Sequence, residues 1–145
     1  MYTKQLRKIC KILDEVENIN CGGCGISALA MYRALHKLDK TIKPRFAYLY
    51  YEYERADFEH NAKAYANNEL DDLCVPSHVV FEFNGKLWDS TGRVNKYPIV
   101  QRNINLKALM ATINNVDKWN TWFDRKEEIP LIESNLQIKL RGIKR

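Results

Sequence analysis

Two stretches near the start of the chain place apolar residues three or four positions apart, which is the spacing of an amphipathic helix. In residues 3–17 these are Leu6, Ile9, Cys10, Leu13 and Val16. In the second stretch, which begins at Cys24, they are Ile26, Leu29, Tyr32, Leu35 and Leu38. The pattern predicts two helices joined by a turn over residues 18–23. Since Cys10 lies on the apolar stripe of the first helix, we expect it to be a buried, inert thiol.

Strand patterns follow these helices. Residues 44–54, PRFAYLYYEYE, are aromatic-rich and predict a strand whose tyrosines pack in a sheet. Residues 77–92, SHVVFEFNGKLWDSTG, hold two β-rich runs around Asn84-Gly85, a pair typical of a two-residue hairpin turn. We expect helices in the acidic segment 56–73 and in residues 104–124, with Trp119 and Trp122 as core anchors, and a short edge strand over 135–140. The pattern indicates an α+β fold in one domain spanning residues 1–145.

The expected hairpin also fixes which side chains share a face. With Asn84 and Gly85 in the turn, Phe81 lies opposite Trp88, and that face points to the core. His78 and Asp89 then lie on the other face as diagonal neighbours, with Cα atoms roughly 7–8 Å apart, close enough for a hydrogen bond between long side chains. The plainer interpretation is an exposed polar pair on a solvated sheet face.

Charge and composition limit the expected location and partners of the protein. The charged first residues lack the apolar run of a signal peptide, and no apolar stretch is long enough to span a membrane, so we expect a cytoplasmic protein with no membrane partner. The net charge is +5, although residues 52–72 carry seven acids against two basic residues. The basic tail KLRGIKR comes without a groove-binding motif, which makes a nucleic-acid partner an unfavoured interpretation. The acidic segment running into His78 suggests a preference for basic substrates.

Cys24 stands where a loop gives way to a helix. Free backbone N–H groups and the positive end of the helix dipole favour a thiolate there. The same N–H groups can stabilise an oxyanion during acyl transfer. A nearby imidazole would act as the general base, and a carboxylate would orient that imidazole. Cys24, His78 and Asp89 therefore form a candidate catalytic set of nucleophile, general base and orienting group.

These residues resemble the transglutaminase-like and papain-like cysteine enzyme superfamily. CGGCGISALA is similar to the papain-type start of a central helix, and His78, Trp88, Asp89 and Thr91 are similar to the transglutaminase-like strands. The resemblance covers roughly residues 18–92 and implies a central helix that begins at the catalytic cysteine and packs on a small antiparallel sheet. It implies a minimal cysteine peptidase, deamidase or acyl transferase that needs no cofactor and acts on a protein, a peptide or a small amide. Asn18 stands where papain-like enzymes carry the oxyanion glutamine, with Asn20 as the alternative. Gly22, Gly23 and Gly25 would let substrate approach the backbone.

Other functions compete with catalysis. Cys21, Cys24, Cys74 and His78 have the ligand types and pair spacing of a structural zinc site. A redox Cys-x-x-Cys pair is less favoured, because a helix and not a strand precedes the motif. A non-catalytic binding module on an enzyme-like fold is the remaining alternative. The sequence leaves the substrate and the oligomeric state open.

Overall fold

The structure is a computed structural model that describes residues 2–16, 24–74, 76–114 and 128–143. Two helices come first, α1 (Thr3–Asp14) and α2 (Cys24–Leu38). Strand β1 (Phe46–Tyr50) leads through the short 3-10 turn η1 (Glu52–Glu54) into α3 (Arg55–Ala66) and η2 (Leu70–Asp72). Four strands and two helices complete the described chain: β2 (His78–Phe83), β3 (Lys86–Asp89), β4 (Gly92–Arg93), β5 (Ile99–Ile104), α4 (Leu106–Asn114) and α5 (Ile129–Ile143).

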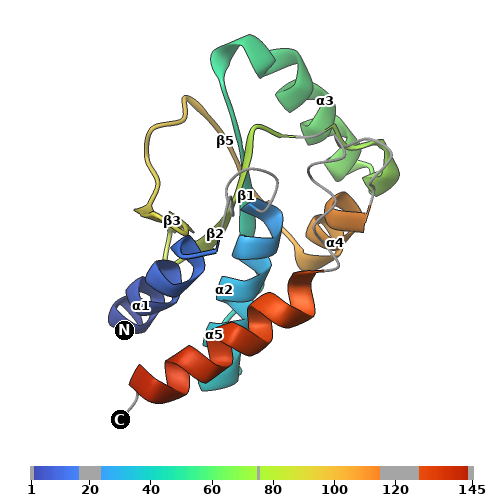
Figure 1. The fold of residues 1–145 in the computed structure, drawn as a ribbon. Coiled ribbons are helices and arrows are strands. Elements are labelled where there is room, and N and C mark those ends of the chain that lie inside the picture. The colour runs from blue at the N-terminus through green and yellow to red at the C-terminus, as the bar shows by residue number, and fades with distance from the viewer. Residues whose placement is uncertain (1, 17–23, 75, 115–127, 144–145) are drawn as a thin grey trace.

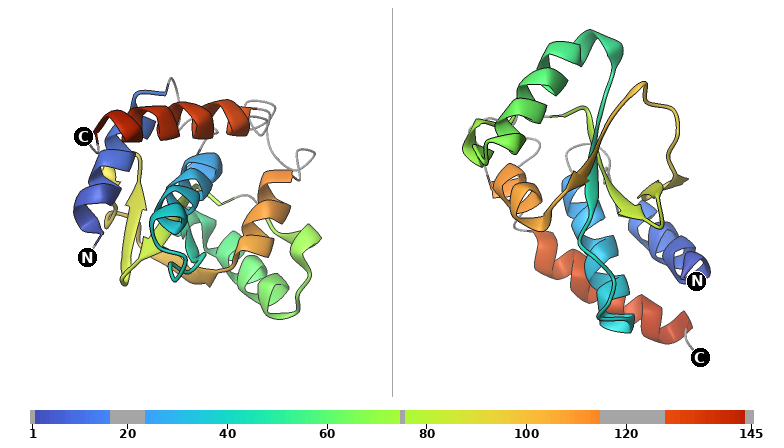
Figure 2. Two further views of the ribbon diagram at one scale, coloured as in Figure 1. Left: turned by 90° about the horizontal axis from the view of Figure 1, so that it is seen from below. Right: turned by 180° about the vertical axis from the view of Figure 1, so that it is seen from behind.

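The described strands form one antiparallel sheet in the order β4-β3-β2-β1-β5. Helix α2 lies against this sheet, and α5 crosses α2 on the side away from the strands (Figures 1 and 2). The expected α+β class is therefore confirmed, with helices gathered on one face of an antiparallel sheet.

Helix α2 is the central element because it is apolar almost all round. Nearly every side chain from Cys24 to Leu35 is buried, as in a helix enclosed by other elements. Small residues let neighbours approach closely. A Cβ added to Gly25 would lie 3.4 Å from Cγ1 of Ile113, so the missing side chain at Gly25 makes room for α4.

The two faces of the sheet bury separate apolar clusters. The inner face contributes Phe46, Tyr48, Phe81 and Trp88 to the main core shared with the helices. The outer face carries a smaller cluster made of Ala47, Leu49, Val80, Leu87 and Val94. By the alternation of side chains along a strand, His78 and Asp89 belong to this outer face. The hairpin prediction is confirmed, since Phe83, Glu82 and Phe81 pair with Lys86, Leu87 and Trp88.

The tyrosine-rich strand is shorter than expected. It ends at Tyr50, and residues 52–54 turn into η1. Tyr48 and Tyr50 are fully buried, as predicted, but Tyr51 and Tyr53 are 42 % and 84 % exposed. The prediction that all four tyrosines pack in the sheet is therefore wrong for the last two, because the chain leaves the sheet before reaching them.

The C-terminal expectations need two corrections. Residues 135–140 are not an edge strand but part of α5, whose buried Ile132 and Leu136 lie four positions apart. Residues 99–104, for which no strand was expected, form β5 beside β1. The predicted helix over 104–124 is confirmed only over 106–114, as α4, since Ile104 still belongs to β5. Residues 115–124, with Trp119 and Trp122, lie outside the described residues. Among the described helices, none has the length and apolar character needed to cross a membrane.

Candidate active site

The first element of the site is a buried histidine–carboxylate pair. His78 is the first residue of β2 and Asp89 the last of β3, so the hairpin brings both to the same end of the sheet. His78 Nε2 lies 2.8 Å from Asp89 Oδ2, and both residues are less than a tenth exposed. The predicted diagonal pair is thus formed, but it is buried and not solvated.

The other carboxylate oxygen of Asp89 is held by the turn that follows. Asp89 Oδ1 accepts hydrogen bonds from the backbone N–H of Thr91 at 2.7 Å and from Thr91 Oγ1 at 2.5 Å. The chain then turns through Gly92, whose φ of +114° is a conformation that favours glycine. Burial raises the pKa of Asp89, but the hydrogen bonds from His78 and Thr91 outweigh it, so the pKa lies below its ordinary value. The carboxylate is therefore ionised and fixed in orientation.

Cys24 approaches the imidazole from the helical side. It is the first residue of α2 and is 3 % exposed. The Cys24 side chain lies near enough to His78 to raise the pKa of the imidazole, and since Asp89 contacts Nε2, Nδ1 is the ring nitrogen left to interact with sulfur. The imidazole thus joins a thiol on one side to a carboxylate on the other.

The charge state of His78 follows from these contacts. Burial disfavours the imidazolium and lowers the pKa of His78, whereas the hydrogen bonds to Asp89 and to Cys24, with the charges behind them, raise it. The second effect is larger, and the pKa of His78 rises from 6.5 to about 9. With this pKa the imidazole of His78 is protonated at neutral pH, so both of its ring nitrogens can donate a hydrogen bond.

A tyrosine that the sequence analysis did not single out covers the imidazole. The ring of Tyr97, in the segment between β4 and β5, stacks on His78 with centroids 5.7 Å apart. The ring of Tyr51 contacts that of Tyr97 in turn, with centroids 5.0 Å apart, and the ring of the exposed Tyr53 stacks on Tyr51. Burial, followed by its hydrogen bond with Tyr51, raises the pKa of Tyr97, so its hydroxyl stays protonated. No local signal marks Tyr97, because its place beside His78 depends on how β5 returns to the sheet.

The predicted oxyanion residues are only partly described. Asn18, Asn20 and Gly23, together with Cys21 of the zinc hypothesis, lie outside the described residues. Gly25 is in the first turn of α2, where backbone N–H groups have no partner within the helix. Its Cα faces α4, so its missing side chain serves helix packing.

The structure offers no metal cluster among the residues it describes. No three His, Cys, Asp or Glu side chains in that part of the chain gather as a metal site requires, so Cys24, Cys74 and His78 do not form one. The backbone of Cys74 is instead hydrogen-bonded to Asn61. Cys10 is a buried core thiol, as expected, and burial, the largest cause, raises its pKa to about 12.

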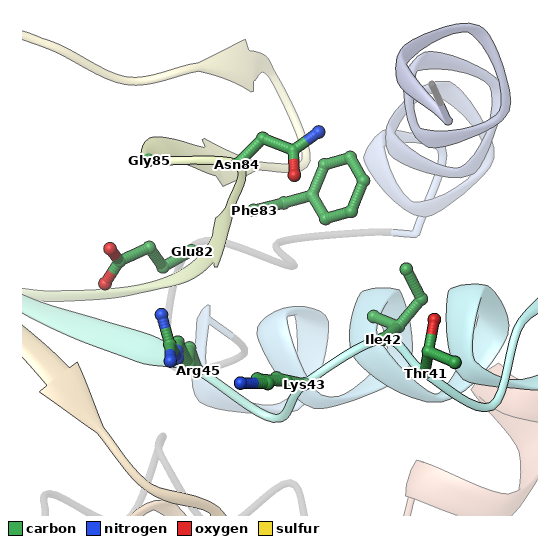
Figure 3. A pocket seen from close by; sticks show the side chains of 8 residues that line it. All are labelled: Thr41, Ile42, Lys43, Arg45, Glu82, Phe83, Asn84 and Gly85. Atoms are coloured by element: carbon green, nitrogen blue, oxygen red, sulfur yellow. The ribbon is translucent and has the colours of Figure 1, made fainter.

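A pocket of about 310 Å³ lies elsewhere, at the hairpin turn, and is lined by residues 41–43, 45 and 82–85 (Figure 3). It is at the opposite end of β2 from His78, so it belongs to a different part of the molecule. Comparisons of the chain with family models, with curated proteins and with solved structures give no match.

Proposed function

We propose that this protein is a thiol enzyme that cleaves or transfers an amide or related acyl bond through Cys24, His78 and Asp89. The observation that carries the proposal is the imidazole of His78, which is hydrogen-bonded to a buried carboxylate and whose pKa is raised by the neighbouring thiol at the start of a helix. The order of nucleophile on the central helix, base on one strand and carboxylate on the next supports membership of the transglutaminase-like and papain-like superfamily.

The first half of the proposed reaction makes a thioester. Sγ of Cys24, its proton held on Nδ1 of His78, attacks the carbonyl carbon, and the C=O electron pair moves onto the oxygen. Backbone N–H groups in the first turn of α2, at Cys24 and Gly25, are the donors proposed for this oxyanion, with the amides of Asn18 or Asn20 assisting. The C–N bond then breaks as Nδ1 gives its proton to the leaving amine.

The second half releases the acyl group. His78, now neutral, takes a proton from water or from an acceptor amine as that nucleophile attacks the thioester. The C–S bond breaks, and the thiolate again faces the imidazolium. Water yields a carboxylic acid, as in a peptidase or deamidase, whereas an amine yields a new amide. Asp89 keeps Nε2 protonated and the ring oriented throughout.

The first test measures thiol alkylation by iodoacetamide across pH on the native protein, with the labelled site mapped by mass and zinc assayed on the same sample. We expect Cys24 to react below pH 7, ahead of Cys10 and Cys74. We expect His78→Ala to slow it at least about tenfold, because the thiolate loses its imidazolium partner. His60→Ala, which removes an exposed histidine on α3, is the matched control.

Two outcomes overturn the proposal. Alkylation of Cys24 that is equally fast in wild type, His78→Ala and His60→Ala would mean that the imidazole does not activate the thiol, which favours a non-catalytic binding module. Bound zinc whose removal exposes Cys21, Cys24 and Cys74 together would favour the structural metal site.

A further inference from the structure

Three tyrosine rings lead from the catalytic imidazole to the surface of the protein. The ring of Tyr97 stacks on His78, with centroids 5.7 Å apart. The ring of Tyr51 lies 5.0 Å from that of Tyr97, and Tyr53 stacks on Tyr51 with centroids 5.7 Å apart and an interplanar angle of 11°. We call Tyr97, Tyr51 and Tyr53 the tyrosine row. Because the row begins on the imidazole, a substrate group that lies on it stays close to the reacting atoms.

The outer end of the tyrosine row is open to a ligand. Tyr53 is 84 % exposed although Tyr51 covers one face of its ring, so the other face of Tyr53 is left to solvent. Large aromatic side chains that are exposed next to one another are typical of a surface that binds a ligand or a partner. The negative face of a tyrosine ring attracts flat groups, which stack on it, and cations, which lie above it.

A carboxylate beside the tyrosine row favours a cation. Glu54 follows Tyr53 in the chain, and its Oε1 accepts hydrogen bonds from the backbone N–H of Tyr51 at 2.9 Å and from the hydroxyl of Ser77. Ser77 directly precedes His78, so these bonds hold the Glu54 carboxylate at the same end of the sheet as the imidazole. Among the described residues both bonds go to Oε1, which leaves Oε2 of Glu54 for a ligand.

The cations next to this site in the sequence do not neutralise Glu54. Arg55 forms its ion pair with Glu52, at 2.7 Å. Lys96, which precedes Tyr97, is exposed and forms no ion pair with Glu54 within the described part of the chain. The expectation of basic substrates rested on the acidic segment as a whole, and these contacts narrow it to one carboxylate beside an open aromatic ring.

A guanidinium group meets both requirements of this site. It is flat, so it stacks on a tyrosine ring, and its N–H groups donate to a carboxylate in the same plane. We propose that the tyrosine row and Glu54 bind a guanidinium group of the amide substrate, such as an arginine side chain. Two ring contacts separate Tyr51 from the imidazole, a distance that about three extended residues span, so the arginine lies within about three residues of the bond that breaks. This inference rests on the proposed function.

The test compares thiol-reactive probes that differ in one group. Chloroacetyl-arginine amide, with and without a glycine spacer before the arginine, is matched with its citrulline twin, which is flat but neutral. The lysine twin is charged but not flat. We expect the arginine probe to alkylate Cys24 about tenfold faster than the citrulline probe at one spacer length or both, and faster than the lysine probe, since stacking and a charge-assisted contact both add to binding.

Variants show which side chains carry the preference. Glu54→Gln should lower the ratio of the arginine rate to the citrulline rate to about one, and Tyr53→Leu should lower it several-fold. Tyr53→Phe keeps a ring, and Glu59→Gln removes an exposed carboxylate elsewhere on α3, so both should keep the ratio. A ratio that neither Glu54→Gln nor Tyr53→Leu changes would overturn the assignment, as would a lysine probe that reacts as fast as the arginine probe.

Iodoacetamide alkylation of each variant separates this inference from the proposed function. If iodoacetamide labels Cys24 in a His78-dependent manner but the arginine and citrulline probes react equally, the tyrosine row is not a guanidinium site and the catalytic proposal stands. If Cys24 is not activated, the same probes made with acetyl in place of chloroacetyl are tested for binding to Cys24→Ser protein by calorimetry. Tighter binding of the arginine compound that depends on Glu54 supports the guanidinium site without the proposed function, and equal binding of both twins overturns it.

Discussion

Nε2 of His78 lies 2.8 Å from Oδ2 of Asp89, although eleven positions separate the two residues in the sequence. The Asn84-Gly85 turn sets the register that brings them to one end of the hairpin. Both groups are buried, so each depends on the other to carry a charge. The pair is therefore a sensitive point both for the activity proposed above and for stability.

Replacing Asp89 by Asn tests the role of the charge with little change of shape. The amide can still contact Nε2, but it no longer stabilises an imidazolium, so the pKa of His78 should fall. We expect the rate of iodoacetamide alkylation of Cys24 at neutral pH to drop at least about tenfold. Asp57→Asn on α3 is the matched control. An equal loss in both variants, or no loss in Asp89→Asn, would count against an orienting role for Asp89.

The raised pKa of His78 also predicts how stability depends on pH. His78 binds its proton more tightly in the folded than in the unfolded state, because the folded pKa is about 9 and the ordinary value is 6.5. Its contribution is then complete below about pH 6.5 and is lost as the pH rises through about 9. The loss is at most about 3 kcal/mol.

Urea unfolding at closely spaced pH values between 6 and 10 measures this effect. The free energy of unfolding should decline over that window in wild type and decline less in His78→Gln, where no imidazole titrates. His60→Gln should follow wild type. A wild-type curve parallel to that of His78→Gln would show that the pKa of His78 does not differ between the folded and unfolded states.

The sequence could predict the parts of the site that depend on local pattern. The Asn-Gly turn determines the hairpin register, and the loop-to-helix change places Cys24 at the start of α2. The prediction of a C-terminal edge strand was wrong because six residues, 135–140, alternate as a strand does, whereas the longer helical spacing of Ile132, Leu136 and Leu140 decides the fold. Strand β5 was missed because Gln101, in its middle, is buried for a non-local reason, the hydrogen bond from Tyr50. Tyr97 comes just before β5, and it reaches His78 because β5 pairs with the distant strand β1.

Gly92 offers a test that separates the position of Asp89 from the overall stability of the protein. Alanine fits the space, since nothing lies within 4 Å of a Cβ at this position, but the φ of +114° is strained for any L side chain. We expect Gly92→Ala to lose about 1–3 kcal/mol of unfolding free energy. It should also slow alkylation of Cys24, because the turn that holds Asp89 through Thr91 must shift.

Gly85 is the matched control for Gly92, because it also has positive φ, at the other end of the hairpin. Gly85→Ala should lower the unfolding free energy by a similar amount and leave the alkylation rate of the folded protein unchanged. Thermal or urea unfolding and iodoacetamide kinetics are measured on both variants. A rate change of the same size in both would mean that the reactivity follows general stability and not the position of Asp89.

Asn61 ties together the segment that leads into His78. Its side chain is fully buried, donates to Tyr50 Oη at 2.8 Å and to the carbonyl of Cys74 at 2.9 Å, and accepts from the N–H of Cys74 at 2.7 Å. Asn61→Ala leaves these groups without their partner and opens a cavity, so we expect a loss of about 2–4 kcal/mol in unfolding free energy. Asn67→Ala, at the exposed end of α3, should change it by less than about 0.5 kcal/mol. Urea unfolding measures the unfolding free energy of the two variants. Equal unfolding free energies would show that the hydrogen bonds of Asn61 add nothing to the stability of the fold around β2.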